Sequence, residues 1–486
     1  MAVEDSIFFQ EIRADHGKIV NDLPKFELES YVGNYEGILR LFKLRCIAHT
    51  SPPLSADAFR LLIQELKRGI NVDMYMQVVE EFSKLLPSDP LAQVDTEWAE
   101  TTARRVKTDT DRLERELKAY KNNLIKESIR MGQEDLGNHY FLVGDYPSAF
   151  KAYTKMREFC TTPKQIAQMT FKLLYVAIMQ RNWAIAASYQ PKMGALQLSS
   201  EEKAKFDPIL FACVGLSHLQ QCHYRDAARA FLNVDQQYMT LQEAQGGIVF
   251  QKQVMTPNDV AVYGGLCALA TMDRAELQRR VLDNTTFRPL LELEPHIRRA
   301  ISMFCSSKYK SCLQVLESYM ADYLLDFYLN GHFLKLYQLV RSKCIVQWFS
   351  AYSSVTWQEI ESHFPNNLLD IDLEDELRGM IRNGVLDARI DLVDKVLVSP
   401  NPDSRIAVIQ DTLSMAKTTE HALRLRLHNI NMRAAGLVVK SPNQGAMNLS
   451  MLAEQGSEFF NGAMGLRQGG GGAQGKIKKA NGANMV

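Results

Sequence analysis

The side chains that could carry out chemistry are dispersed along this sequence and form no recognisable active-site motif. Zinc hydrolases present their ligands as His-Glu-x-x-His on a helix or His-x-His on a hairpin, and neither spacing occurs. There is no Gly-x-Ser-x-Gly nucleophile elbow, and no cysteine lies in a local nucleophile signature. His421 and His428 are one heptad apart, a spacing typical of solvated helix positions. We therefore predict no catalytic residue, no metal site and no cofactor.

One stretch imitates a phosphate-binding loop. Gly470, Gly475 and Lys476 have the required spacing, but Ile477 stands where a Ser or Thr hydroxyl must reach magnesium. No strand pattern precedes the match, and the segment around it is rich in glycine. We interpret it as an accident of composition.

The composition limits the class of protein further. The 486 residues carry 56 Lys and Arg against 56 Asp and Glu, which argues against coating a nucleic acid or an acidic membrane by charge alone. The acidic N-terminus predicts no signal peptide, and no uncharged apolar stretch reaches the roughly 18 residues of a membrane span. The eight cysteines form no Cys-x-x-Cys pair, which favours free thiols in a cytoplasmic or nuclear protein.

The elements that must position any functional surface are mostly helical. Ten of the 27 glycines follow Ser441, so the rest of the chain is poor in helix breakers. We expect residues 1–26 to be a disordered acidic tail and residues 27–120 to form an N-terminal helical region. Apolar residues recurring on one face among charged ones predict a single long helix over residues 98–130.

A repeat follows, and it predicts helical hairpins of the tetratricopeptide (TPR) type over residues 121–234. Small residues that let two helices approach alternate with aromatic residues that fill the gap. The first copy contains Gly137, Tyr140, Gly144, Tyr146, Ala149 and Tyr153, and a shift of 78 positions gives Gly215, His218, Cys222, Tyr224, Ala227 and Phe231. Weaker copies lie near Trp183 and Tyr309. Whether or not they are true repeats, these segments predict a curved stack of helices.

After residue 350 the pattern changes to two short helices and a hairpin, which predicts a winged helix over about 350–400. The hairpin strands are expected at residues 385–390 and 395–398. Residues 355–400 carry ten acids and four bases, which disfavours DNA binding and favours protein contacts. In one interpretation, the edge near Arg389 and Ile390 pairs with a neighbouring winged helix by strand addition. In the other, the wing only caps the helical stack.

A long helix is predicted over residues 403–440. Its apolar residues alternate in steps of three and four, as in a coiled-coil seam. The seam includes Ile406, Ile409, Leu413, Leu423, Leu427, Ile430 and Leu437. At roughly 57 Å, such a helix is too long to bury its seam against one small domain, so we expect partner helices; a helix folded back on the stack is the alternative. Residues 441–486 are expected to be a disordered Gly-rich tail.

A helical-repeat stack leading into a winged helix and a long C-terminal helix resembles the PCI-domain family. Four stretches are similar to the subunit-one family of the COP-nine signalosome: NVDMY at residues 71–75, IKESIR at 125–130, DLGNHY at 135–140 and DVAVYGGLCALAT at 259–271. The similarity runs from about residue 28 to about residue 437. The resemblance implies that residues 235–400 form the PCI domain and that the fold is mostly α.

The resemblance also implies a function. It implies a non-catalytic scaffold subunit of the complex that removes Nedd8 from cullins and regulates cullin-RING ubiquitin ligases, with the isopeptidase in another subunit. The winged helix and the C-terminal helix would contact other subunits, and the N-terminal repeats would face ligase components, in the cytoplasm and nucleus. The alternative is the paralogous PCI subunit of the 26S proteasome lid. Neither implies direct contact with nucleic acid or membrane.

Overall fold

The computed structural model describes residues 6–14, 17–240, 244–365, 372–400 and 404–437. The chain divides into two compact units, residues 1–400 and 401–486. We call the first unit the body. The second is described only over residues 404–437.

The N-terminal part of the body is a group of five helices with a hydrophobic core of its own. They are α1 (Ile7–Ala14), α2 (Leu28–Gly33), α3 (Gly37–Thr50), α4 (Pro52–Arg68) and α5 (Val72–Leu85), followed by the short η2 (Pro90–Ala92). The prediction of a disordered tail over residues 1–26 is wrong for α1. Its Phe8 and Phe9 are buried, and the Phe8 ring lies 5.6 Å from that of Phe59. These two aromatic side chains bury enough apolar surface to hold α1 in place, although the acidic residues around them had predicted disorder.

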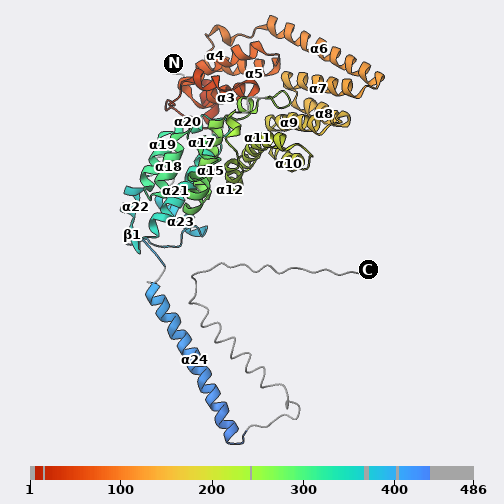
Figure 1. The fold of residues 1–486 in the computed structure, drawn as a ribbon. Coiled ribbons are helices and arrows are strands. Elements are labelled where there is room, and N and C mark those ends of the chain that lie inside the picture. The colour runs from red at the N-terminus through yellow and green to blue at the C-terminus, as the bar shows by residue number, and fades with distance from the viewer. Residues whose placement is uncertain (1–5, 15–16, 241–243, 366–371, 401–403, 438–486) are drawn as a thin grey trace, which may run out of the picture. The chain divides into compact units, whose positions relative to one another are not determined.

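The charged segment that follows forms two helices, α6 (Thr96–Asn123) and α7 (Lys126–Val143). The prediction of one helix over residues 98–130 is therefore wrong. Leu124 adopts a left-handed conformation with φ of 53° and ends α6, after which α7 runs back alongside it (Figure 1). The apolar face that predicted one helix is shared between the two, because Leu117 of α6 packs against Ile129 and Leu136 of α7.

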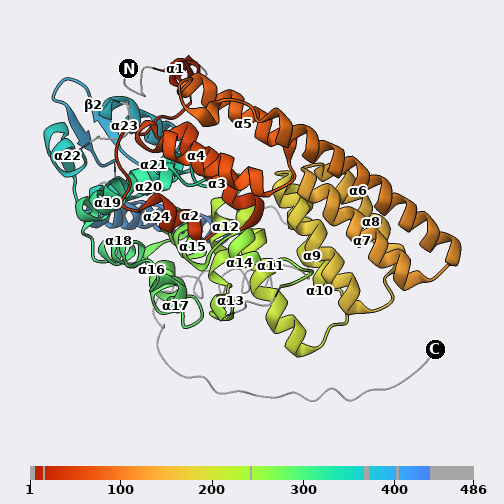
Figure 2. The ribbon, with the colours of Figure 1, turned by 90° about the horizontal axis from the view of Figure 1, so that it is seen from above.

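The helical hairpins are confirmed at the glycine positions of the two strongest copies. They consist of α7 with α8 (Tyr146–Met156) and of α11 (Ser200–Gln220) with α12 (Tyr224–Leu232). A Cβ on Gly137 would lie 2.5 Å from the Tyr153 ring, and one on Gly215 would lie 2.7 Å from the Phe231 ring. Figure 2 shows α6 to α10 lying side by side. The small residue and the aromatic ring thus fit each other across each hairpin.

The remaining helices complete this stack or connect it to the winged helix. They are η3 (Arg157–Phe159), α9 (Pro163–Met179), α10 (Trp183–Gly194), α13 (Gln237–Thr240), α14 (Phe250–Gln253), α15 (Pro257–Thr271), α16 (Arg274–Leu277), the π-helical η4 (Gln278–Leu282), α17 (Arg288–Leu291), α18 (Pro295–Cys305), α19 (Tyr309–Ser318), α20 (Met320–Leu324) and α21 (Phe333–Phe349). Helix α15 is buried along most of its length. One continuous core extends from the repeat stack through α15 and α21 into the wing.

The winged helix contains β1 (Ser354–Thr356), α22 (Trp357–His363), α23 (Leu373–Arg382), β2 (Arg389–Asp391) and β3 (Val396–Val398). Its sheet is antiparallel with the order β1-β3-β2, so the predicted two-stranded hairpin is one strand short. Arg341 of α21 anchors this module. Its guanidinium donates to both carboxylate oxygens of Glu376 at 2.9 and 3.1 Å and to the carbonyls of Phe364 and Pro365.

The described part of the second unit is the helix α24 (Ser404–Ala434). Gly436, with φ of 69°, ends it: the Leu437 N–H donates to the Met432 carbonyl at 3.1 Å, which is the Schellman arrangement. The predicted extent to residue 440 is therefore too long, and Leu437 lies beyond the helix. The tail predicted over residues 441–486 lies outside the described residues.

Candidate assembly surfaces

The hydrogen bonds of the small sheet determine which strand edge is open. The Ser399 N–H donates to the Ser353 carbonyl, and the Trp357 N–H donates to the Lys395 carbonyl. Hydrogen-bonded and non-hydrogen-bonded pairs alternate along an antiparallel ladder, so the Val355–Leu397 pair, two positions from each of these bonds, is hydrogen-bonded as well. The N–H and carbonyl of Leu397 are therefore directed towards β1. Its neighbours Val396 and Val398 are then directed towards β2.

The same alternation leaves one residue of β2 facing outward. Because Arg389 and Asp391 pair with β3, the N–H and carbonyl of Ile390 point away from the sheet. Among the described residues, neither group has a hydrogen-bond partner. The Ile390 side chain is half-buried and in register with the fully buried Leu397. Strand β2 therefore presents a donor and an acceptor at a fixed position.

The opposite edge of the sheet is partly occupied. In β1, the Thr356 N–H donates to the side chain of Glu359 at 3.4 Å, and the Glu359 N–H donates back to the Thr356 hydroxyl. This capping box begins α22 and uses a backbone group that an added strand would need. Of the two edges, β2 is the more available for strand addition.

The surface beside β2 combines apolar and basic side chains. A groove of about 590 Å³ lies between α23 and the wing, and Arg378, Arg382 and Arg389 are among the residues that line it. Next to it, Leu392 and Val393 expose 59% and 90% of their surface. The acids that give residues 355–400 their negative charge are partly neutralised from outside that segment, since Glu376 pairs with Arg341 of α21.

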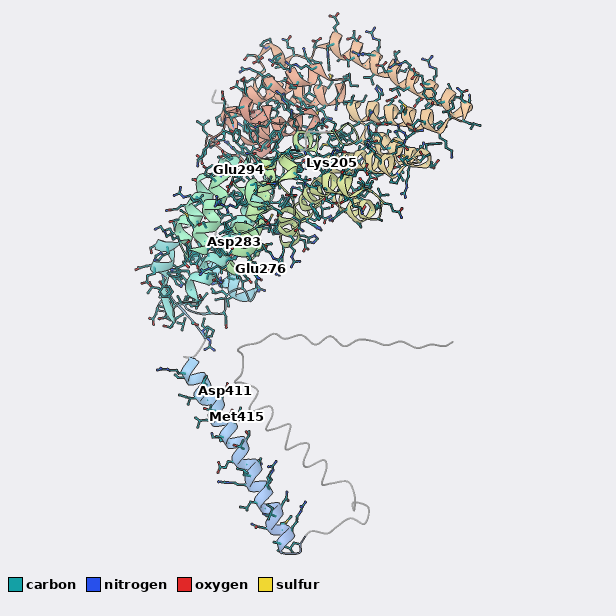
Figure 3. All side chains as sticks on the ribbon, viewed as in Figure 1. Lys205, Glu276, Asp283, Glu294, Asp411 and Met415 are labelled. Carbon is teal, nitrogen blue, oxygen red and sulfur yellow. The ribbon has the colours of Figure 1, made fainter. Side chains whose placement is uncertain are left out.

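Helix α24 exposes its apolar residues along its whole described length. Figure 3 shows its side chains, with Met415 labelled. The predicted seam residues are exposed by 48–63%: Ile406, Ile409, Leu413, Leu423, Leu427 and Ile430. Val408, Met415 and Leu425 are exposed as well and lie outside the seam. The apolar arc is thus wider than a two-stranded coiled coil needs, which favours contact with more than one partner helix.

The most strongly perturbed titratable groups are structural. Lys43 of α3 is buried, and its Nζ lies 2.6 Å from an Asp326 oxygen and 3.7 Å from one of Asp259. Burial alone would lower the pKa of Lys43, but the two carboxylates outweigh it and raise the pKa. Burial acts to raise the pKa of Asp326, yet Lys43 and hydrogen bonds from Tyr263 and the backbone hold it below its usual value. This network fixes the N-terminal helices to the rest of the body.

Within the described ranges, no group of three or more His, Cys, Asp or Glu side chains could hold a metal ion. Across those same ranges, no helix has the length and apolar character needed to cross a membrane.

Comparison with known proteins identifies the family. A model described as 26S proteasome subunit RPN7 matches residues 95–280, and the PCI domain model matches residues 316–401. COP9 signalosome complex subunit 1 of Emericella nidulans is 46% identical over 430 residues, which is 87% of this chain and 84% of that protein. The chain belongs to the COP9 signalosome complex subunit 1 family.

Other members of the COP9 signalosome subunit 1 family agree with this assignment. The Arabidopsis thaliana protein is 34% identical over 84% of this chain and 89% of its own length. The proteasome alternative is weaker, because the 26S proteasome non-ATPase regulatory subunit 6 of Oryza sativa is 28% identical over only 41% of this chain and 48% of its own length. The signalosome resemblance is thereby confirmed, and the mostly α fold with a winged helix agrees with the PCI match.

The predicted site residues of this family member occupy two separate surfaces. Arg389 and Ile390 lie on the edge strand β2, and six of the seven seam residues lie on α24. The sequence analysis missed the residues that hold the wing and the N-terminal helices in place, Arg341 and Lys43. In both cases the available signal was a cation at a position of the apolar helical period. Lys43 lies four residues from both Leu39 and Ile47, and Arg341 lies four residues from both Tyr337 and Ile345. The roles of Arg389, Ile390 and the seam in assembly stay predictions.

Proposed function

We propose that this chain is a non-catalytic scaffold subunit that enters its complex through two surfaces, the edge of β2 and the apolar arc of α24. The outward N–H and carbonyl of Ile390 suit an added strand, which gains affinity from main-chain hydrogen bonds. The exposed leucines and isoleucines of α24 suit a helical bundle. Both surfaces would be occupied by other PCI subunits.

The activity of the complex is part of the same proposal. As the resemblance implies, the complex removes Nedd8 from cullins and regulates cullin-RING ubiquitin ligases, in the cytoplasm and nucleus. The isopeptidase would belong to another subunit. The lack of His-Glu-x-x-His and His-x-His in this sequence supports that division. The N-terminal repeats would contact ligase components.

The observation that carries the assembly role is the outward backbone of Ile390, and proline substitution tests it. Proline lacks an N–H, so Ile390→Pro removes the donor offered to a partner and no bond to β3. We expect the variant chain to fold with an unchanged unfolding temperature and to be recovered at less than a tenth of the wild-type yield in the reconstituted complex.

Asp391→Pro is the matched control. The Asp391 N–H is directed to β3, so this change removes a bond within the sheet and should lower the unfolding temperature of the isolated chain. Full incorporation of the Ile390→Pro variant would refute strand addition at β2. Equal destabilisation by both prolines would show that the register does not direct Ile390 outward.

A further inference from the structure

The body contains a cleft that neither assembly surface uses. It has a volume of about 790 Å³ and lies where the segment leading into α2 meets α15, α18 and α20. Figure 3 labels Glu294, which precedes α18 and lies in its wall. Its size falls within the range of small-molecule pockets. Aromatic residues contribute much of the lining, including Phe26, Tyr31 and Tyr319.

Three buried polar atoms in the lining have no hydrogen-bond partner among the described residues. They are the Tyr323 hydroxyl, the Gln251 Oε1 and the His296 Nε2. Tyr323 is 4% exposed and Gln251 is 8% exposed, so both are more than nine-tenths buried. Leaving such atoms unpaired costs free energy. Their concentration in one cleft indicates that the cleft is built to receive a polar group.

The hydrogen bonds already made indicate which kind of group is missing. The His296 Nδ1 lies 3.2 Å from a Glu294 carboxylate oxygen and donates to it, which leaves Nε2 as the ring atom without a partner among the described residues. The Gln251 amide nitrogen donates to the Tyr238 carbonyl, which leaves its oxygen as an acceptor. The cleft therefore presents the unpaired Gln251 oxygen beside the carboxylates of Glu294 and Asp322, a set of acceptors that suits a ligand rich in donors.

The charges in the cleft favour a cation. The lining contains four carboxylates against the two cations Lys25 and Lys252. Two of the carboxylates, Asp259 and Asp326, are paired with Lys43, which leaves Asp322 and Glu294. Both add to the effect of burial in raising the pKa of Tyr323. At the rim, the chain itself supplies one example: the Lys25 Nζ lies 3.4 Å from the Tyr319 ring centroid. Among the described residues, those of the cleft included, no group of three or more His, Cys, Asp or Glu side chains could hold a metal ion.

We propose that this cleft binds a guanidinium group. A guanidinium presents five donors in a plane, pairs with carboxylates such as Asp322 and stacks on aromatic rings. The Tyr319 ring has no free face, because His296 stacks on one side at 4.0 Å between centroids and the Lys25 Nζ lies 3.4 Å from the centroid on the other. The stacking surface is therefore left to Phe26, which is itself stacked on Tyr31 at 4.2 Å between centroids. The group could be carried by a small molecule or by an arginine in a peptide. This inference does not depend on the assembly role proposed above.

Titration calorimetry with the full chain tests the proposal. The probe is N-acetyl-arginine methylamide, and its neutral isostere, the citrulline derivative, is the ligand control. We expect the arginine probe to bind at least tenfold more tightly than the citrulline and lysine derivatives. No detectable binding, or equal binding of the citrulline derivative, would overturn the proposal. Equal binding of the lysine derivative would overturn the guanidinium assignment.

Substitutions locate the binding in the cleft. Asp322→Asn should weaken binding of the arginine probe at least tenfold, and Tyr323→Phe about threefold. Tyr328→Phe is the matched control, because the Tyr328 hydroxyl is also buried without a partner among the described residues but is not part of the lining. Unchanged binding by Asp322→Asn, or an equal loss with Tyr328→Phe, would refute the site. A pentapeptide with a central arginine distinguishes the sources: tighter binding than the probe supports a peptide, and equal binding a small molecule.

Discussion

The hairpins of the body and the helix α24 use apolar residues at similar helical spacing with opposite results. In the hairpins α7–α8 and α11–α12, a glycine faces an aromatic ring of the next helix, and the ring fills the space that the missing side chain leaves. Helix α24 has no glycine, and its leucines and isoleucines are more than half exposed in most cases. Small residues opposite large ones close a hairpin within one chain, whereas a row of large residues provides knobs for other helices.

The buried charges of the body are also paired within the body. Arg341 and Glu376 are almost fully buried, with 1% and 2% of their side chains exposed, and each finds its partner within the body. The ion pair described within α24, between Arg424 and Glu420, has side chains that are 77% and 60% exposed. The body therefore pairs these buried charges internally, whereas the three unpaired polar atoms of the cleft are left for a ligand. Among the described residues of α24, the apolar side chains are exposed, and a partner helix would bury them.

The largest loss of body stability is expected from removing Arg341. Arg341→Met leaves the Glu376 carboxylate buried without a counter-charge, which should lower the free energy of unfolding by about 3–5 kcal/mol. The matched control is Arg378→Met, because Arg378 pairs with Glu374 and Asp375 at the surface and should contribute less than about 1 kcal/mol. Denaturant unfolding of the body measures both. Equal effects of the two substitutions would contradict the anchoring role of Arg341.

A smaller loss is expected from adding one methyl group to a hairpin. In Gly215→Ala the new Cβ would lie 2.7 Å from the Phe231 ring, and the forced separation should cost about 1–3 kcal/mol. In Gly379→Ala nothing lies within 4 Å of the new Cβ, so the same change in α23 should stabilise the body by up to about 1 kcal/mol. The midpoint of denaturant unfolding should decrease for Gly215→Ala and increase for Gly379→Ala, with the denaturant dependence of the free energy unchanged in both. A stabilising Gly215→Ala would contradict the close approach of α11 and α12.

The sequence predicted the features that depend on local spacing. The glycine and aromatic positions of the hairpins, the helix α23 and the seam of α24 all follow from periodicity within a single helix or hairpin. Strand β1 was missed because three residues carry too little alternation. Helix α1 was missed because neighbouring acids outweighed Phe8 and Phe9 in the pattern.

The long-range ion pairs could not be predicted from spacing. Lys43 meets Asp326 across 283 positions and Arg341 meets Glu376 across 35, and only the folded chain brings them together. The sequence places each cation at a position of the apolar helical period, but it does not identify the partner. The same holds for the cleft, whose lining comes from segments spread over 300 positions.

A modest pH dependence should belong to the body. Burial lowers the pKa of His332, and Lys335 and Lys18 add to the effect. The unfolded chain therefore binds this proton more readily than the folded chain. The free energy of unfolding rises with pH between the lowered pKa of folded His332 and the ordinary histidine pKa, and it falls when the solution is acidified through that range. The unfolding temperature, measured from pH 7.5 to 5.5, should fall less in His332→Gln than in the wild type. An identical fall in both would show that other groups carry the dependence.

The smallest effect on the body is expected from α24. Replacing Leu413, Leu423 and Leu427 by Gln removes exposed apolar surface and no contact within the body core, so the free energy of unfolding of the body should change by less than about 0.5 kcal/mol. Incorporation into the reconstituted complex should nevertheless be lost, as should that of a chain ending at residue 400. Replacing Thr412, Thr418 and Thr419 by Gln in the same helix serves as the control and should preserve incorporation. If the leucine variant were incorporated at full stoichiometry, the apolar arc of α24 would not be an assembly surface, and its contrast with the packed hairpins would need another cause.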